Sequence, residues 1–156
     1  MVRNPARYAE RRDMINYLPY KYCQATFFIP ICGEERLGVQ FFIYENRKKL
    51  RLGISKYKNV EGAAGYFTTN PNEGNFIEAE IHLDISVIGG GYVAHEIQHF
   101  VQWWIYKNSL KFIDEDFEKV SDITGEMTSK FWDRFYDLYK EIKPGKKNEN
   151  DSQPNQ

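Results

Sequence analysis

The sequence predicts a single domain of the α+β class, and three features of the chain lead to this prediction. Short runs rich in Phe, Ile, Val and Tyr fill the segment from Cys23 to Leu83, and turn-forming sequences separate them. Two longer segments with helical periodicity follow these runs. Strands and helices that are segregated along a chain are typical of α+β folds, and 156 residues suffice for one sizeable apolar core.

The first predicted element is a short N-terminal helix. Asn4 followed by Pro5 is typical of an N-cap with proline at the first helical position. Apolar residues then recur at roughly helical spacing as far as Leu18. We therefore expect this helix to end at about Leu18.

Four to five strands are predicted in the middle of the chain, joined as hairpins or as a meander into one twisted sheet. Their β-branched and aromatic side chains suit a pleated, partly buried surface. The predicted strands span residues 25–31, 38–44, 50–54, 65–68 and 75–83.

The last of these strands alternates apolar and polar side chains. Apolar residues at every second position from Ile77 to Leu83 alternate with Glu78, Glu80 and His82. A period of two predicts one core face and one polar, half-exposed face. We expect this strand to border a cleft, where an extended peptide could add to the sheet.

Two long helices are predicted after the glycines at 89–91, which we interpret as a hinge rather than a phosphate-binding loop because the lysine of a P-loop is missing. The segment 92–107 lacks helix breakers, and Asn108 ends it. Asp114 suits the N-cap of the next helix, and the acidic residues after it are favoured by the helix dipole. The apolar stripe of this second helix continues to Lys143.

Pro144 and Gly145 end the second long helix. The polar composition of the remaining residues predicts a disordered tail over 144–156. The predicted domain therefore spans residues 1–143.

Charge and hydropathy exclude several classes of function. The chain has 21 Lys and Arg against 22 Asp and Glu, so its net charge of −1 gives no general attraction to nucleic acid or to anionic membranes. No apolar run approaches the length of a membrane span, and the N-terminus is too charged for a signal peptide. We expect a cytoplasmic protein with no nucleic-acid or membrane partner.

Residues 95–99 read His-Glu-Ile-Gln-His, an HExxH motif within the first long predicted helix. Residues four apart share one helix face, so His95 and His99 can bind one metal ion while Glu96 contacts a water on that ion. A catalytic zinc ion has three protein ligands and keeps the fourth position for water, whose pKa it lowers toward about 7. A third ligand must therefore come from another segment.

The candidate third ligand lies on the second long predicted helix. Glu118 follows His99 by nineteen positions, and Asp122 stands four residues later on the same face. A metal-bound histidine usually donates its other ring N–H to a carboxylate, and Asp122 suits that task for His95. Glu126 is the competing third ligand, although no acidic residue stands four positions after it.

Residues 118–125, EKVSDITG, match the pattern E-x-[IV]-S-D-I-x-G at six positions. In this pattern and in the HExxH motif, the segment 75–140 resembles the gluzincins, the thermolysin-like branch of the zinc metallopeptidases. The separation of the two motifs is one residue shorter than in thermolysin, and Phe117 stands where thermolysin has an asparagine. The size and layout of the chain resemble the minimal metallopeptidase-like proteins of phages and mobile elements.

The resemblance implies a zincin-like fold in which the HExxH helix and the glutamate helix pack beneath a twisted sheet. It implies Zn²⁺ bound by His95, His99 and Glu118, with Glu96 as the general base and Asp122 supporting a histidine. The implied activity is hydrolysis of peptide bonds in a peptide or protein substrate. The alternative is a metallopeptidase-derived binding module that sequesters a host protein without turnover; the oligomeric state and the substrate are not predicted.

Peptidases of this type also need a hydrogen-bond donor for the tetrahedral intermediate, often Tyr, His or Arg. Tyr92 and Tyr106 are candidates on the HExxH helix, and Tyr66 is a candidate on a strand. His82 has two interpretations: a hydrogen-bonded or exposed strand histidine, or a substrate or oxyanion contact at the cleft.

Overall fold

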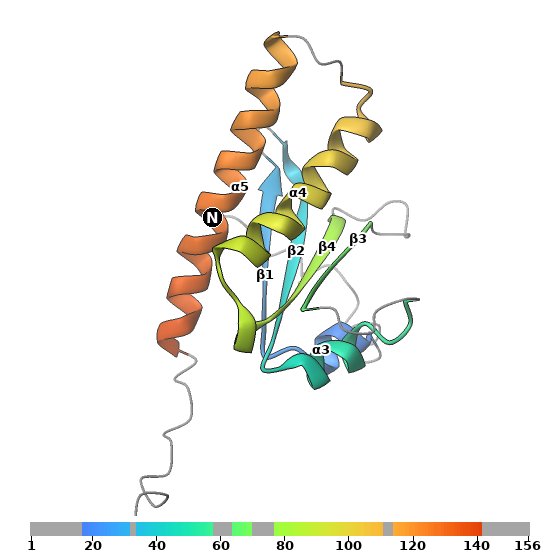
Figure 1. The fold of residues 1–156 in the computed structure, drawn as a ribbon, viewed down its shortest axis with the longest axis vertical. Helices are drawn as coiled ribbons and strands as arrows, with labels where there is room; N and C mark the ends of the chain where they lie inside the picture. Colours follow the sequence, from blue (N-terminus) through green and yellow to red (C-terminus); the bar gives the residue numbers. More distant parts are fainter. Residues whose placement is uncertain (1–16, 32–33, 58–63, 70–76, 111–113, 142–156) are drawn as a thin grey trace, which may run out of the picture.

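The structure is a computed structural model that describes residues 17–31, 34–57, 64–69, 77–110 and 114–141 (Figure 1). It confirms the α+β class, with one four-stranded mixed sheet and several helices. The elements are α2 (Leu18–Tyr22), β1 (Ala25–Ile31), β2 (Glu34–Tyr44), α3 (Arg47–Gly53), β3 (Gly65–Thr69), β4 (Ile77–Asp84), the 3₁₀ turn η2 (Ile85–Val87), α4 (Gly90–Lys107) and α5 (Asp114–Glu141).

The strand order in the sheet is β1-β2-β4-β3. β1 and β2 pair antiparallel, β2 and β4 pair parallel, and β4 and β3 pair antiparallel. Of the two predicted arrangements, hairpins agree with the antiparallel pairs of consecutive strands, β1–β2 and β3–β4, whereas a meander is wrong because β4 lies between β2 and β3. The expectation that an extended peptide could add to the strand at 75–83 is also wrong, because β4 is an inner strand of the described sheet, whose edges are β1 and β3.

Helices α4 and α5 cover one face of this sheet (Figure 1). Alternate strand residues, such as Phe41 and Ile81, point toward them and form the main apolar core. The helices contribute side chains at helical spacing, such as Ile97 on α4 and Met127 on α5. This packing confirms the two long helices that the sequence predicts and leaves the opposite side of each helix in solvent.

The segment 50–54, predicted as a strand, belongs instead to α3 and the turn after it. The Asn46 side chain accepts a hydrogen bond from the backbone N–H of Lys49 at 3.0 Å and so caps the helix. Leu50 and Ile54 stand four residues apart, share one face, and pack against Phe42. The apolar composition of residues 50–54 predicts a strand. The spacing of Leu50 and Ile54, four residues apart, is instead typical of a helical turn, and the structure has one.

The polar face of β4 is buried rather than half-exposed, because α2 and α3 form a second layer on that side of the sheet. Glu80 and His82 point into this layer, and His82 is 0% exposed. The Tyr17 hydroxyl donates to Glu80 at 2.6 Å, and the hydroxyl of Tyr44 lies 2.9 Å from His82 Nδ1. Alternation alone cannot distinguish a solvated polar face from one satisfied by a second layer.

Two predicted features lie outside the described residues: most of the N-terminal helix that was expected to end at Leu18, and the tail at 144–156. In the ranges that are described, none of the helices combines the length and the apolar character that crossing a membrane requires.

Candidate metal centre

The HExxH motif lies in α4, whose apolar stripe determines where its histidines point. Val93, Ile97 and Trp104 belong to the stripe that is buried against the sheet and α5. His95 and His99 lie off this stripe, and both side chains are exposed to solvent. The same pattern that packs the helix therefore presents both imidazoles on an open face.

The two imidazole rings lie next to each other. Their Nε2 atoms are 3.1 Å apart, and the ring planes are perpendicular with centroids 4.6 Å apart. Two Zn–N bonds of about 2.05 Å at a tetrahedral angle would hold the nitrogens roughly 3.3 Å apart. The observed pair comes close to this separation, so the donor set fits two of the ligands of a zinc ion.

Glu96 lies beside the histidine pair and turns toward the sheet. Its side chain is only 5% exposed, because it lies on the buried side of α4 together with Val93, Ile97 and Phe100. Burial raises the pKa of Glu96 to about 7, against an opposing effect of His95. A carboxyl group that titrates near neutral pH is suited to accept and return a proton.

Strand β3 packs against the HExxH helix at the edge of the sheet. A Cβ added to Gly65 would lie 2.6 Å from Oε1 of Glu96, so the two groups are in close contact. Two residues later, the Phe67 ring stacks on His99 with centroids 6.2 Å apart and planes inclined by 18°. The edge strand therefore touches both the acid and one imidazole of the motif.

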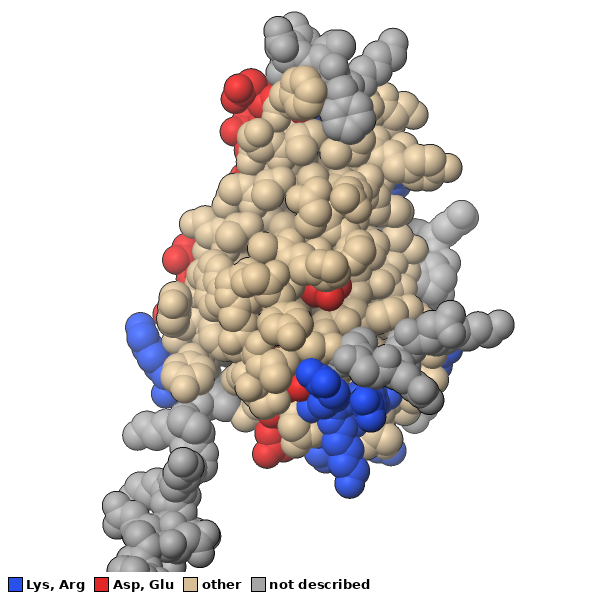
Figure 2. Space-filling model, in the orientation of Figure 1, with Lys and Arg blue, Asp and Glu red and all other residues tan. Residues whose placement is uncertain are grey.

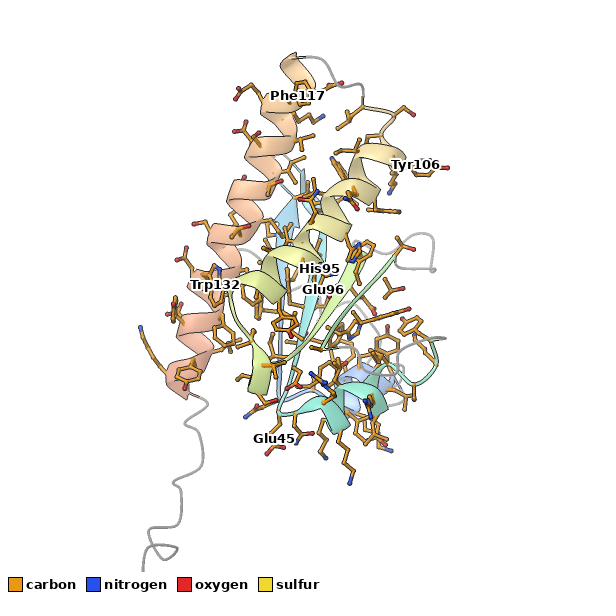
Figure 3. The ribbon with its side chains drawn as sticks, viewed as in Figure 1. Glu45, His95, Glu96, Tyr106, Phe117 and Trp132 are labelled. Atoms are coloured by element: carbon orange, nitrogen blue, oxygen red, sulfur yellow. The ribbon has the colours of Figure 1, made fainter. Side chains whose placement is uncertain are left out.

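A pocket of about 410 Å³ opens between α4 and β3. Its lining residues are Ala64, Gly65, Gly91, Tyr92, His95 and Glu96. Three of these six residues are glycine or alanine, so much of the wall is backbone. Figure 3 shows His95 and Glu96 on the half of α4 that faces this region. The first turns of α4, the side chain of Glu96 and the edge strand β3 therefore line one concave site.

The structure does not bring Glu118 or Asp122 to the histidines. Both are exposed on α5, and among the described residues no group of three or more His, Cys, Asp and Glu could hold a metal ion. Figure 3 places Phe117, the neighbour of Glu118, near the start of α5. His95 lies on the half of α4 that is farther from this end of α5. The third ligand therefore stays a prediction. The competing Glu126 forms an ion pair with Lys130 on α5.

The four candidate substrate or oxyanion contacts fall in different places. Tyr66 lies in the layer on the opposite face of the sheet, where its ring packs near Tyr57 and His82. Tyr92 lines the pocket. Tyr106 is 85% exposed near the end of α4, and Figure 3 shows it well away from Glu96. The cleft-contact interpretation of His82 is wrong, because its ring is enclosed in the layer on the opposite face of the sheet, where both ring nitrogens have partners.

Sequence reasoning missed the contribution of β3. No motif marks Gly65 or Phe67, and their role depends on β4 lying inside the sheet, which local patterns do not predict. The only local signal is a glycine inside a strand, which often marks a close approach of another group.

The surface around this site carries few charges. Figure 2 shows a broad, mostly uncharged area over α4 with a small acidic spot within it, while Lys and Arg gather at the end of the molecule that contains α3. Between Gly90 and Tyr106 the sequence of α4 has one carboxylic acid, Glu96, and no Lys or Arg.

Comparisons of this chain with protein-family models, with curated proteins and with solved structures find no match.

Proposed function

We propose that this chain is a zinc-dependent metallopeptidase with a zincin-like arrangement of sheet and helices. The observation that carries the proposal is the pair of facing imidazoles, with Nε2 atoms 3.1 Å apart, next to a buried acid and an edge strand. A zinc ion bound there would polarise a scissile carbonyl and lower the pKa of a bound water toward about 7.

Each residue of the site has a role in this proposal. His95 and His99 would hold the metal ion with the two ring nitrogens that face each other. Glu96 accepts the proton of the attacking water and later gives it to the leaving amine, for which a pKa of about 7 is suitable. Tyr92, at the pocket wall, donates a hydrogen bond to the oxygen of the tetrahedral intermediate.

Glu118 is proposed as the third ligand, with Asp122 as the carboxylate that orients a histidine. The support is the sequence context of these residues on α5. Both side chains are exposed and point away from the buried stripe of α5, so binding through Glu118 requires α5 to turn or shift on metal binding. Glu126 is the competing ligand, and it would have to leave its ion pair with Lys130.

The proposed substrate is a peptide segment in extended conformation. Within the described sheet β3 pairs with β4 on one side only, so its outer edge is available for a further strand. A peptide added there would pass next to Glu96 and His99, because Gly65 and Phe67 contact those residues.

The test combines metal analysis with cleavage of a peptide library. Purified wild-type protein should bind about one zinc ion per chain and cleave peptides, and His99→Ala should lose both properties. Glu118→Ala should lower the zinc content, with Glu126→Ala as the matched control. Normal zinc content in Glu118→Ala together with loss in Glu126→Ala would transfer the ligand role to Glu126.

A second candidate function is a zinc-binding or fold-derived module that captures a protein without cleaving it. The observation that favours it is the exposed position of Glu118, which leaves the histidine pair without a third ligand among the described residues. A protein that binds zinc and library peptides but cleaves none would support this module and contradict the peptidase.

A further inference from the structure

We propose that Gly65 is a positioning residue for Glu96: the missing side chain leaves the space against β3 in which the carboxyl group of Glu96 lies. The inference rests on the proposed function, in which Glu96 is the general base. It adds a residue from a different element of the fold, and neither the motif nor its spacing points to that residue.

The contact between the two residues is close and specific. A Cβ at position 65 would lie 2.6 Å from Oε1, 2.9 Å from Cγ and 3.0 Å from Cδ of Glu96. The three nearest atoms thus all belong to the side chain of the proposed base. Such distances are shorter than carbon atoms tolerate, so Glu96 could not keep its position beside an alanine.

Other glycines of the sheet layers are excluded from similar roles by what surrounds them. A Cβ at Gly38 would meet the backbone oxygen of Ile29 at 2.3 Å, and one at Gly53 would meet the ring of Tyr44 at 2.4 Å. Those two glycines serve the packing of the fold. Gly65 differs from both because its space is filled by the end of a flexible acidic side chain.

Backbone conformation does not account for the glycine. Gly65 is the first residue of β3, and its φ lies outside the positive range that favours glycine. Glycine is also a poor strand former, because it loses more conformational freedom than other residues and has no side chain to pack. Among the described residues, the group that a side chain at position 65 would displace is Glu96, so the room for its carboxyl group is a physical reason for a glycine here.

The placement matters for the proposed chemistry because a general base acts only within hydrogen-bond reach of the water it activates. Two residues along the same strand, Phe67 stacks on His99. One strand therefore adjoins both the base and a proposed metal ligand. Displacing Glu96 from β3 would move it relative to the histidines without changing either imidazole.

The first experiment compares Gly65→Ala with Gly125→Ala in the zinc-loaded protein. Gly125 is exposed on α5, and no atom of the described residues lies within 4 Å of a Cβ added there. We expect Gly65→Ala to lower kcat about tenfold or more, with zinc content and KM nearly unchanged. Gly125→Ala should keep the wild-type kcat. A Gly65→Ala protein with wild-type kcat would overturn the inference.

A double-mutant cycle separates positioning from general damage to the fold. Glu96→Asp retracts the carboxyl group by one methylene and so relieves the contact with a Cβ at position 65. We expect Glu96→Asp to lower kcat strongly in the wild-type background and only slightly when combined with Gly65→Ala. Additive losses would mean that Gly65 acts independently of Glu96, which contradicts the proposal.

The same contact can be tested without activity, by thermal unfolding of the metal-free protein. Gly65→Ala should lower Tm by roughly 4 °C when Glu96 is present and by much less in a Glu96→Ala background. Equal shifts in both backgrounds would overturn the inference whether or not the protein is a peptidase. A coupled shift in a protein that cleaves no peptide would instead keep the Gly65–Glu96 contact and refute the proposed function.

Discussion

The two faces of the sheet each carry a histidine near a carboxylate, and they use these groups in opposite ways. On the face covered by α2 and α3, His82 has a partner at each ring nitrogen: the Tyr44 hydroxyl at 2.9 Å and Glu80 at 3.2 Å. On the face covered by α4 and α5, His95 and His99 are exposed, and their Nε2 atoms face each other. The covering layer, rather than the residue type, decides which imidazoles are available to a ligand.

The two carboxylates differ in the same way. Burial opposes ionisation of Glu80, but hydrogen bonds with His82 and Tyr17 outweigh it, so the pKa of Glu80 is lowered. Burial raises the pKa of Glu96 to about 7, because no comparable set of partners offsets it. A satisfied carboxylate stabilises the fold, whereas one that titrates near neutral pH is suited to proton transfer.

The largest expected effect is the difference in kcat between variants of Glu96 and Glu80. Glu96→Gln should keep zinc and lower kcat at least about 10³-fold, because an amide cannot take the proton of water. Glu80→Gln, the matched change on the other face, should leave kcat within a few-fold. Peptide cleavage with parallel zinc analysis checks both; comparable losses in the two variants would erase the distinction between the faces.

The second prediction separates the histidines by stability. His82→Ala removes a fully buried ring that stacks on Phe42 with ring centroids 4.9 Å apart, and it leaves Glu80 with the Tyr17 hydroxyl but without the imidazole. We expect a loss of about 3 kcal/mol in the free energy of unfolding, measured by urea denaturation. His99→Ala should cost less than about 1 kcal/mol in the metal-free protein, because its ring is exposed. The reverse order would show that α4 depends on its histidines for folding.

The third prediction concerns the pH dependence of stability in the metal-free protein. The folded pKa of Glu96, about 7, exceeds its ordinary value of 4.5, so the folded state binds more protons between these values. The free energy of unfolding should therefore fall by roughly 2–3 kcal/mol as pH rises from about 5 to about 8. Glu96→Gln should remove this fall, and persistence of the fall in that variant would assign it to another group.

His82 should give the free energy of unfolding a pH dependence of the opposite sign, at lower pH. Burial lowers the pKa of His82 below its usual 6.5, so the unfolded state binds more protons as pH falls through that value. Stability should decrease as pH falls below 6.5, in a range where Glu96 acts in the opposite direction, so the Glu96→Gln variant should show this loss by itself. The two faces thus give separable contributions to one measured profile.

The sequence predicts much of the helix layer and less of the sheet. Periodicity predicts α4 and α5 well because their apolar stripes pack against a single surface, as Ile97 and Met127 do. It fails for β4, where Glu80 and His82 imitate a solvated face although a second layer satisfies them. Strand order is not local information, so β3 is not predicted as the edge.

The candidate site divides along the same line. The spacing within one helix predicts that His95 and His99 share a face and that Glu96 lies next to them, as the structure has them. A ligand on another helix depends on how α4 and α5 pack, and this packing is decided by core side chains rather than by a motif. The role of Glu118 as a metal ligand therefore has to be tested by measuring the zinc content of the Glu118→Ala variant.

The smallest expected effect compares two exposed tyrosines of α4 and tests whether substrate reacts beside the N-terminal half of this helix. Tyr92 lines the pocket with His95, whereas Tyr106 stands 85% exposed near the end of the same helix. Tyr92→Phe should lower kcat about tenfold, since one hydrogen bond to the tetrahedral intermediate is lost, and Tyr106→Phe should leave it unchanged. Both changes keep the ring and its packing, so a difference in kcat reports the hydroxyl alone. If Tyr106→Phe were the slower variant, substrate would have to pass along the C-terminal half of α4, and the pocket beside β3 would not be where peptides react.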